Sequence, residues 1–367
     1  MSTPAEAVRK NPLREIVQPF VDVARAPRAL WGVNLGYVLS RYKGDYDRAI
    51  RLFEKAISLD PENGHGLTNA AWNHMGNALL YSGRFDDAME AFEKYKALSP
   101  GSPDPLNSIA GACCLSGRYD EAIRITEECI AGNNHNFKFF EILGRSYLAK
   151  GQWRKAADAF NNYIGASPSK GYKTTGQVCL AQLYLLQGDR AAFDAQIANM
   201  LSIDPNSVKA MWLSGLAALR FDNDTGLATA FLEKIRAATS DPLVYDETPC
   251  ERHLSGEILL AMGRHGEAIE ELGAAAESSQ REFCYFGREL AAALVSAGRA
   301  DEAEKRCRKL LEFNGNDYAL LMLMDRIYSM KNDTGKAREY RGRALAVLGK
   351  AEPGIVPLES YISNSPL

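Results

Sequence analysis

Residue types that often carry chemistry are present in this sequence, but their spacing supports no catalytic or metal site. The five histidines, at positions 65, 74, 135, 253 and 265, form neither His-Glu-x-x-His nor a comparable ligand spacing with cysteine. The seven cysteines contain no Cys-x-x-Cys pair, and pairing them would leave one over. These thiols therefore fit reduced, buried side chains better than a disulfide framework.

Three further motifs each lack a residue that their chemistry requires. The run from Asp222 to Glu233 has carboxylates at three positions of a calcium loop, but Leu227 stands where the sharp bend needs glycine. We expect a helix-capping turn there instead, in which Asp or Thr oxygens accept from free backbone amides. Gly335-Lys336 lacks the other residues of a phosphate-binding loop, and no Gly-x-Ser-x-Gly elbow occurs. The sequence predicts no enzyme, no metal and no cofactor.

Charge and hydropathy argue against two classes of partner. The chain has 43 basic and 46 acidic residues, a formal net charge of −3, and no block of like charge that would form a nucleic-acid arm. Hydrophobic residues make up 46% of the chain, yet no apolar stretch approaches the roughly 20 residues that cross a bilayer. Residues 1–12 lack the apolar region of a secretory signal. We expect a cytoplasmic protein that binds no nucleic acid and has no membrane-spanning segment.

An internal repeat is the strongest signal in the sequence. A glycine, an aromatic residue and an alanine recur as a motif with fixed spacing, as in Gly83, Phe85 and Ala88. From Ala88 to Ala122 to Ala156 the step is 34 residues each time. The copies are marked by Ala49, Ala88, Ala122, Ala156, Gly188, Ala228, Ala268, Ala303 and Ala337. The chain is therefore predicted to contain about nine units.

Each unit is predicted to contain two helices. Upstream of the turn glycine, apolar residues three and four apart, such as Trp72, Met75 and Leu79, build one helical face. The glycine permits a tight turn, and the small alanine lets the two helices approach closely. A proline after the second helix, such as Pro100, stops it.

This pattern resembles the tetratricopeptide repeat (TPR), whose signature places Trp, Leu-Gly, Tyr, Gly, Tyr, Ala, Phe, Ala and Pro along 34 residues. The match is strongest over residues 69–168. The resemblance implies an all-α fold, a right-handed α-α superhelix of about nine helix-turn-helix repeats over residues 29–349. More narrowly, residues 71–164 resemble the repeat arrays of bacterial signalling and regulatory proteins, which implies a sensing or docking module.

The departures from the repeat lie in the later units and at the two ends. Phe193 takes the place of one close-packing alanine, and the turn at residues 222–226 has a different sequence from the other turns. Prolines in residues 1–28 leave room only for a short helix near residues 13–23, which we expect to cap the array. Residues 350–367 are expected to form a C-terminal tail.

The TPR frame places a ladder of polar residues on the concave face of the early units. The predicted groove residues are Asn73, Asn77, Asn107, Lys138, Glu141, Arg145 and Gln182. Side-chain amides there could bond to the backbone of an extended peptide, while the basic residues could pair with its carboxylates. The clamp that such domains use for acidic chaperone tails is incomplete here, because Asn73 and Ile142 stand where it has basic residues. His253 is expected to line the groove of a later unit.

The leading hypothesis is a non-enzymatic scaffold that holds a partner peptide or helix in the groove of the first five units. An alternative is a sensing or docking module of a bacterial signalling or transcription-regulatory system, bound to a separate chain. A remote alternative is a hydrolase or transferase with an unrecognised site, because function resides in sites and not in folds. The groove residues themselves have a simpler explanation as solvated side chains of an unoccupied face.

Overall fold

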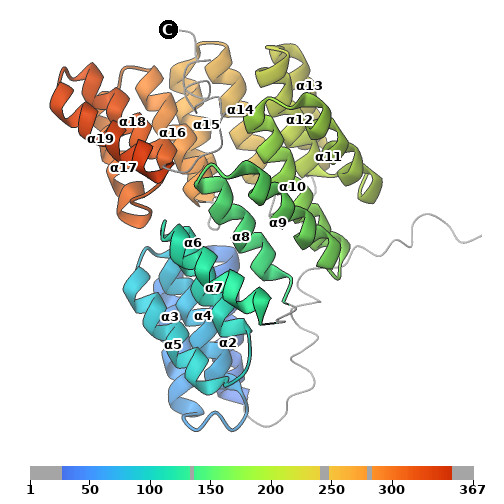
Figure 1. Cartoon of the computed structure of the whole chain (residues 1–367), viewed down its shortest axis with the longest axis vertical. Helices are drawn as coiled ribbons and strands as arrows, with labels where there is room; N and C mark the ends of the chain where they lie inside the picture. The colour runs from blue at the N-terminus through green and yellow to red at the C-terminus, as the bar shows by residue number, and fades with distance from the viewer. Residues whose placement is uncertain (1–26, 133–135, 240–247, 279–282, 349–367) are drawn as a thin grey trace, which may run out of the picture.

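The computed structural model describes residues 27–132, 136–239, 248–278 and 283–348, and every regular element within them is a helix (Figure 1). The elements are α2 (Pro27–Val38), α3 (Tyr46–Leu59), α4 (Leu67–Tyr81), α5 (Phe85–Leu98), α6 (Asp104–Leu115), α7 (Tyr119–Ala131), α8 (Lys138–Ala149), α9 (Trp153–Ala166), α10 (Lys170–Gln187), α11 (Arg190–Ile203), α12 (Val208–Phe221), α13 (Thr225–Thr239), α14 (Thr248–Ala261), α15 (His265–Ser278), α16 (Phe283–Ser296), α17 (Ala300–Phe313), α18 (Tyr318–Met330) and α19 (Thr334–Val347), with a π-helical turn, η3 (Leu39–Lys43), after α2. The capping helix predicted near residues 13–23 and the tail predicted from residue 350 lie outside the described residues.

The helices form consecutive pairs that stack into a curved array. Helices α2 and α3 make unit 1, α4 and α5 make unit 2, and the pairing continues to unit 9, which contains α18 and α19. Figure 1 shows these units following one another along a superhelical path. The prediction of an all-α superhelix with about nine helix-turn-helix repeats is confirmed.

One residue with left-handed backbone geometry builds the turn inside most units. Gly83, Gly117 and Gly151 have φ angles of 83°, 79° and 67°. In these three turns the amide of the next residue bonds back to the last turn of the first helix, at 2.8 to 2.9 Å. Asparagine takes the same role late in the chain, where Asn223 and Asn332 have φ angles of 50° and 61°. Glycine and asparagine tolerate this geometry best, which is why these residue types mark the repeat.

The repeating alanines lie where the two helices of a unit cross. The alanines with no exposed surface at this position are Ala49, Ala88, Ala122, Ala156, Ala228, Ala268 and Ala303. A glycine of the first helix adds a second close contact in several units. A methyl group on Gly76 would lie 2.5 Å from the ring of Phe92, and one on Gly144 would lie 2.5 Å from the ring of Phe160. The two helices of these units can therefore approach closely only because the residues at their crossing have a small side chain or none.

The later units replace these small residues without losing the helix pairs. Phe193 of unit 5 is fully buried, and its ring lies 5.7 Å from that of Phe221 in a T-shaped arrangement. At the rewritten turn of unit 6, the carboxylate of Asp224 accepts from the backbone amide of Leu227 at 2.8 Å, which confirms the predicted capping turn. Residues 240–247, which contribute to the wider spacing before unit 7, lie outside the described residues.

The apolar core runs along the array as a series of clusters shared by neighbouring units. One cluster joins units 1 to 3, and others join units 4 and 5, units 5 to 7, and units 8 and 9. Each unit therefore buries its apolar faces by stacking on its neighbours, as in other repeat proteins. Over the described ranges, no helix combines the length and the hydropathy that crossing a membrane requires.

The first prediction compares two glycines within first helices. Gly144→Ala should lower the free energy of unfolding by about 1–3 kcal/mol, because its new methyl group overlaps the Phe160 ring. Gly111→Ala is the matched control, since its methyl group would lie 3.8 Å from the nearest side-chain atom, of Ile142. There, alanine's higher helix propensity should raise stability by up to about 1 kcal/mol. Urea unfolding followed by circular dichroism measures both, and equal shifts would contradict the assigned contact.

Candidate partner-binding groove

The first helices of the units lie on the inner side of the curve. Helix α4 contacts α2 and α6, and α6 also contacts α8, so the first helices of units 1 to 4 form a continuous surface. The second helices are held mainly by the helices before and after them in the chain. Helix α10 packs against α9 and α12, and α12 contacts α14, which extends a second stretch of inner surface through units 5 to 7. The predicted groove residues are carried by the first helices α4, α6, α8 and α10 of this inner side.

The asparagines of the early units form a hydrogen-bonded network between two helices. The side-chain amide of Asn77 donates to the backbone carbonyl of Asn73 at 2.8 Å and to its side-chain oxygen at 3.4 Å. The same Asn73 oxygen accepts from the hydroxyl of Ser108 on α6 at 3.1 Å. Asn107 lies beside Ser108 in the chain, and its side-chain oxygen is buried without a hydrogen-bond partner. The network is thus preformed, and one acceptor on it is unsatisfied.

The remaining predicted groove residues are not gathered into one cluster. Glu141 and Arg145 lie one turn apart on α8 and form an ion pair of 3.0 Å, with side-chain exposures of 26% and 30%. Lys138 is exposed at the start of α8. Gln182 is half-buried on α10, which packs against α9 and not chiefly against α8. The structure therefore connects Asn73 with Asn77 and Glu141 with Arg145. Lys138 lies one helical turn before Glu141 on α8, and Gln182 lies apart on α10.

The inner side of the later units carries polar contacts that the sequence prediction largely missed. The indole N–H of Trp212 donates to Nδ1 of His253 at 3.1 Å, and both side chains are buried. Arg220 and Glu257 form an ion pair of 3.5 Å between α12 and α14. Burial raises the pKa of Glu257, and the charge of Arg220 opposes that shift. His253 is therefore a buried hydrogen-bond acceptor, not an open groove residue.

The inward position of His253 could have been found from its spacing in the repeat. His253 precedes its turn glycine by ten residues, as do Asn73, Asn107 and Glu141 of the early groove. Residues at that position therefore face inward in early and late units alike. The sequence does not reveal that Trp212 would cover His253, because the one-residue longer turn of unit 6 shifts the register of α12.

The cysteines are poor candidates for thiol chemistry. Cys113, Cys114, Cys179 and Cys307 are buried. Burial raises the pKa of the Cys113 and Cys307 thiols to about 12, so the nucleophilic thiolate is scarce at neutral pH. Within the described ranges, no three His, Cys, Asp or Glu side chains come together in a way that could hold a metal ion.

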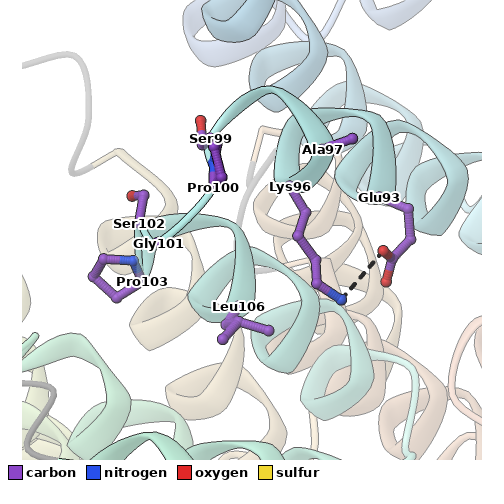
Figure 2. A pocket seen from close by; sticks show the side chains of 9 residues that line it. All are labelled: Glu93, Lys96, Ala97, Ser99, Pro100, Gly101, Ser102, Pro103 and Leu106. Atoms are coloured by element: carbon purple, nitrogen blue, oxygen red, sulfur yellow. Dashed lines mark hydrogen bonds and ion pairs between the residues drawn. The ribbon is translucent and has the colours of Figure 1, made fainter.

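Two hollows lie on the outer side of units 2 and 3. The first, of about 530 Å³, is formed where α5 passes into α6, and Figure 2 shows its lining from Glu93 to Leu106. Lys96 and Glu93 form an ion pair of 3.3 Å at its edge. The second, of about 540 Å³, lies between α5, α6 and α7 and has Arg124 and Glu128 among its lining residues. None of the predicted groove residues lines either hollow.

Known sequence families match the early units. A family model described as tetratricopeptide repeat matches residues 40–103, where the glycine, aromatic and alanine positions form the helix crossings described above. The chain is a tetratricopeptide repeat protein. A second model, described as anaphase-promoting complex, cyclosome, subunit 3, matches residues 81–163 of the TPR array.

Individual relatives of this TPR protein are distant. Cellulose synthase operon protein C of Pseudomonas fluorescens (strain SBW25) is 26% identical over 73% of this chain and 22% of that protein. A TPR repeat-containing protein of Methanocaldococcus jannaschii is 23% identical over 77% of this chain and 55% of that protein. The chain thus spans less than two thirds of either relative. The solved structure of the APC/C hetero-tetramer Cut9–Hcn1 matches with 14% identity and a TM-score of 0.44, covering 97% of this chain and 80% of that one.

The second prediction concerns His253, whose imidazole is buried in the TPR array. Burial, with a smaller effect of Arg220, lowers the pKa of His253 from 6.5 to about 3. The unfolded chain therefore binds a proton below about pH 6.5 that the folded chain does not, so stability falls as pH drops through that range. His253→Gln keeps an acceptor for Trp212 and cannot be protonated.

Between pH 7 and pH 5, the wild-type protein should lose about 1–2 kcal/mol more unfolding free energy than the His253→Gln variant. The measurement is urea unfolding at a series of pH values. His65 is exposed, and His65→Gln provides the control, which should follow the wild-type curve. Parallel curves for wild type and His253→Gln would show that His253 is not held neutral in the folded state.

Proposed function

We propose that this protein is a non-enzymatic scaffold that binds an extended segment or a helix of a partner protein on the inner surface of its first five units. The observation that carries the proposal is the polar network of Asn73, Asn77 and Ser108 across α4 and α6. An amide both donates and accepts, so such a surface can bond to a partner's backbone, whose donors and acceptors alternate.

The rigidity of the surface supports the same function. The helices that carry the network are fixed by buried contacts such as Gly76 against Phe92, so the surface needs little ordering when a partner binds. The Glu141–Arg145 pair on the neighbouring helix would supply charged contacts at the edge of the bound segment.

Membership of the TPR family supports a protein-interaction role, because such arrays present an extended concave surface to a partner. The partner of the present chain would be recognised by backbone hydrogen bonds and by one or two charged side chains. A ligand recognised mainly by charge is disfavoured, because the early inner surface combines neutral amides with a paired Glu and Arg.

The third prediction tests this groove. A variant with Asn73, Asn77, Asn107, Lys138 and Arg145 changed to alanine should lose the partner that the wild-type protein captures from extract of its native cell. With the purified partner, titration should show an affinity at least about tenfold lower, as expected when several central contacts are truncated. Circular dichroism of both proteins establishes that each remains folded.

An outer-side variant serves as the matched control. Changing Glu93, Lys96, Arg124 and Glu128 to alanine removes charges around the two hollows and leaves the inner surface intact. This variant should bind the partner as the wild-type protein does. Loss of binding in the outer-side variant, with binding retained by the inner-side variant, would refute the groove assignment.

A further inference from the structure

Two turns that are far apart in the sequence touch each other in the folded array. The side-chain amide of Asn314, at the end of α17, donates to the hydroxyl of Tyr119 at 2.9 Å. The side-chain amide of Asn316 donates to the backbone carbonyl of Gly117, also at 2.9 Å. Phe313 packs against the apolar cluster of units 1 to 3. The contact thus joins the internal turn of unit 3 to the connection between units 8 and 9, as Figure 1 shows where α17 lies close to α6.

Gly117, Tyr119 and Asn314 are buried in the contact, Asn316 lies at its exposed edge, and no room is left for a side chain on the turn glycine. A methyl group on Gly117 would overlap the side-chain oxygen of Asn314 and lie 3.2 Å from Cβ of Asn316. At the equivalent turn of unit 2, a methyl group on Gly83 would meet nothing within 4 Å. Tyr119 is 9% exposed, and its pKa is raised chiefly by burial and further by the charge of Asp317. The turn of unit 3 is therefore covered, whereas that of unit 2 is open.

Each side of the contact is held in shape by its own unit. The turn after α6 is closed by the bond from the amide of Arg118 to the carbonyl of Cys113, at 2.8 Å. On the other side, the carboxylate of Asp317 accepts from the amide of Leu320 at 3.1 Å and lies 3.6 Å from Arg288. Neither set of bonds crosses between the two turns. Separation of the turns would therefore break only the contacts between them.

We propose that Gly117, Tyr119, Asn314 and Asn316 form a latch that closes the superhelix on itself and can open without unfolding the units on either side. A solenoid is stabilised by contacts between neighbouring units, so a contact between units five or six places apart is not needed to form either unit. Its two hydrogen bonds and the packing of Phe313 are few contacts compared with the buried stacking inside the array.

The latch determines access to the inner surface. When it is closed, the edge of unit 3 meets the edge of units 8 and 9, and the first helices of units 4 to 7 are enclosed along that edge. These include α8, which carries the Glu141–Arg145 pair of the proposed groove. When it is open, the ends of the array can move apart, and a long partner segment can reach the inner surface from the side. This consequence rests on the proposed function, whereas the opening of the latch does not.

The fourth prediction uses the two turn glycines as a matched pair. Gly117 and Gly83 have φ angles of 79° and 83°, and each is followed by arginine and an aromatic residue. Alanine at either position introduces the same backbone strain, but only Gly117→Ala forces Asn314 away. Hydrogen exchange in residues 311–320 should become at least about tenfold faster in Gly117→Ala than in Gly83→Ala, and small-angle scattering should show a larger radius of gyration.

A second variant opens the latch without changing the turn. Asn316→Ala removes the bond to the Gly117 carbonyl and should shift exchange and scattering in the same direction as Gly117→Ala. Equal exchange and scattering for Gly117→Ala and Gly83→Ala would overturn the latch. Global unfolding of Gly117→Ala, with Gly83→Ala still folded, would also overturn it, because the proposed opening leaves the units intact.

A measurement of partner binding distinguishes the proposal of the latch from the proposal of the groove. With a partner that binds the wild-type protein, Gly117→Ala should associate at least about threefold faster than Gly83→Ala, since the binding-competent form is more populated. Equal association rates would overturn the role of the latch in access. Failure of the groove proposal is detected independently, by retained binding in the five-residue alanine variant, and would leave the exchange and scattering results unaffected.

Discussion

The architecture depends on the close approach of the two helices within each unit. In units 1, 2 and 4 the first helix carries a glycine against a phenylalanine ring of the second, with Gly36 facing Phe53 in unit 1. The alanine of the second helix, such as Ala88, is completely buried at the same crossing. A small increase in volume at either position must displace a packed ring or helix, because protein interiors have few voids to absorb it. The crossing angle between the two helices of a unit is thereby fixed. Because successive units stack with this same geometry, the array as a whole is curved.

The curve decides which side chains can meet a partner. Because the first helices lie on the inner side and contact one another, residues at the same position of successive units form a row across them. In the early units this row contains Asn73, Asn107 and Glu141, and in the later units it contains His253. The early residues keep some exposure, while His253 is sealed under Trp212. The two halves of one inner surface therefore differ in chemistry: the early half offers amides, and in the later half His253 and Glu257 are paired with Trp212 and Arg220.

The helix pairs, the turns and the buried alanines were predictable from the sequence because they recur at a fixed step. The capping role of Asp224 was predictable for a similar reason, since a short-range bond depends on residues three apart. The network of Asn73 with Ser108 was not predicted, although the frame placed Asn73 correctly on the first helix of its unit. Contacts between side chains of neighbouring units depend on the crossing angle of the helices, which a repeat pattern does not specify. For the same reason the sequence could not show that Gln182 lies apart from the early asparagines.

The contact between Asn314 and Tyr119 shows more clearly what a repeat pattern in the sequence cannot predict. Gly117 and Tyr119 carry the same signature as Gly83 and Phe85, and nothing in the pattern distinguishes a covered turn from an open one. The distinction arises only after the small rotations of five or six units have been summed, so it depends on all the helix crossings between them. A change in packing at any of these crossings would move Asn314 relative to Tyr119. The long-range contact and the local glycine and alanine contacts are therefore coupled: the local packing of the units sets the curvature, and the curvature decides whether the two turns meet.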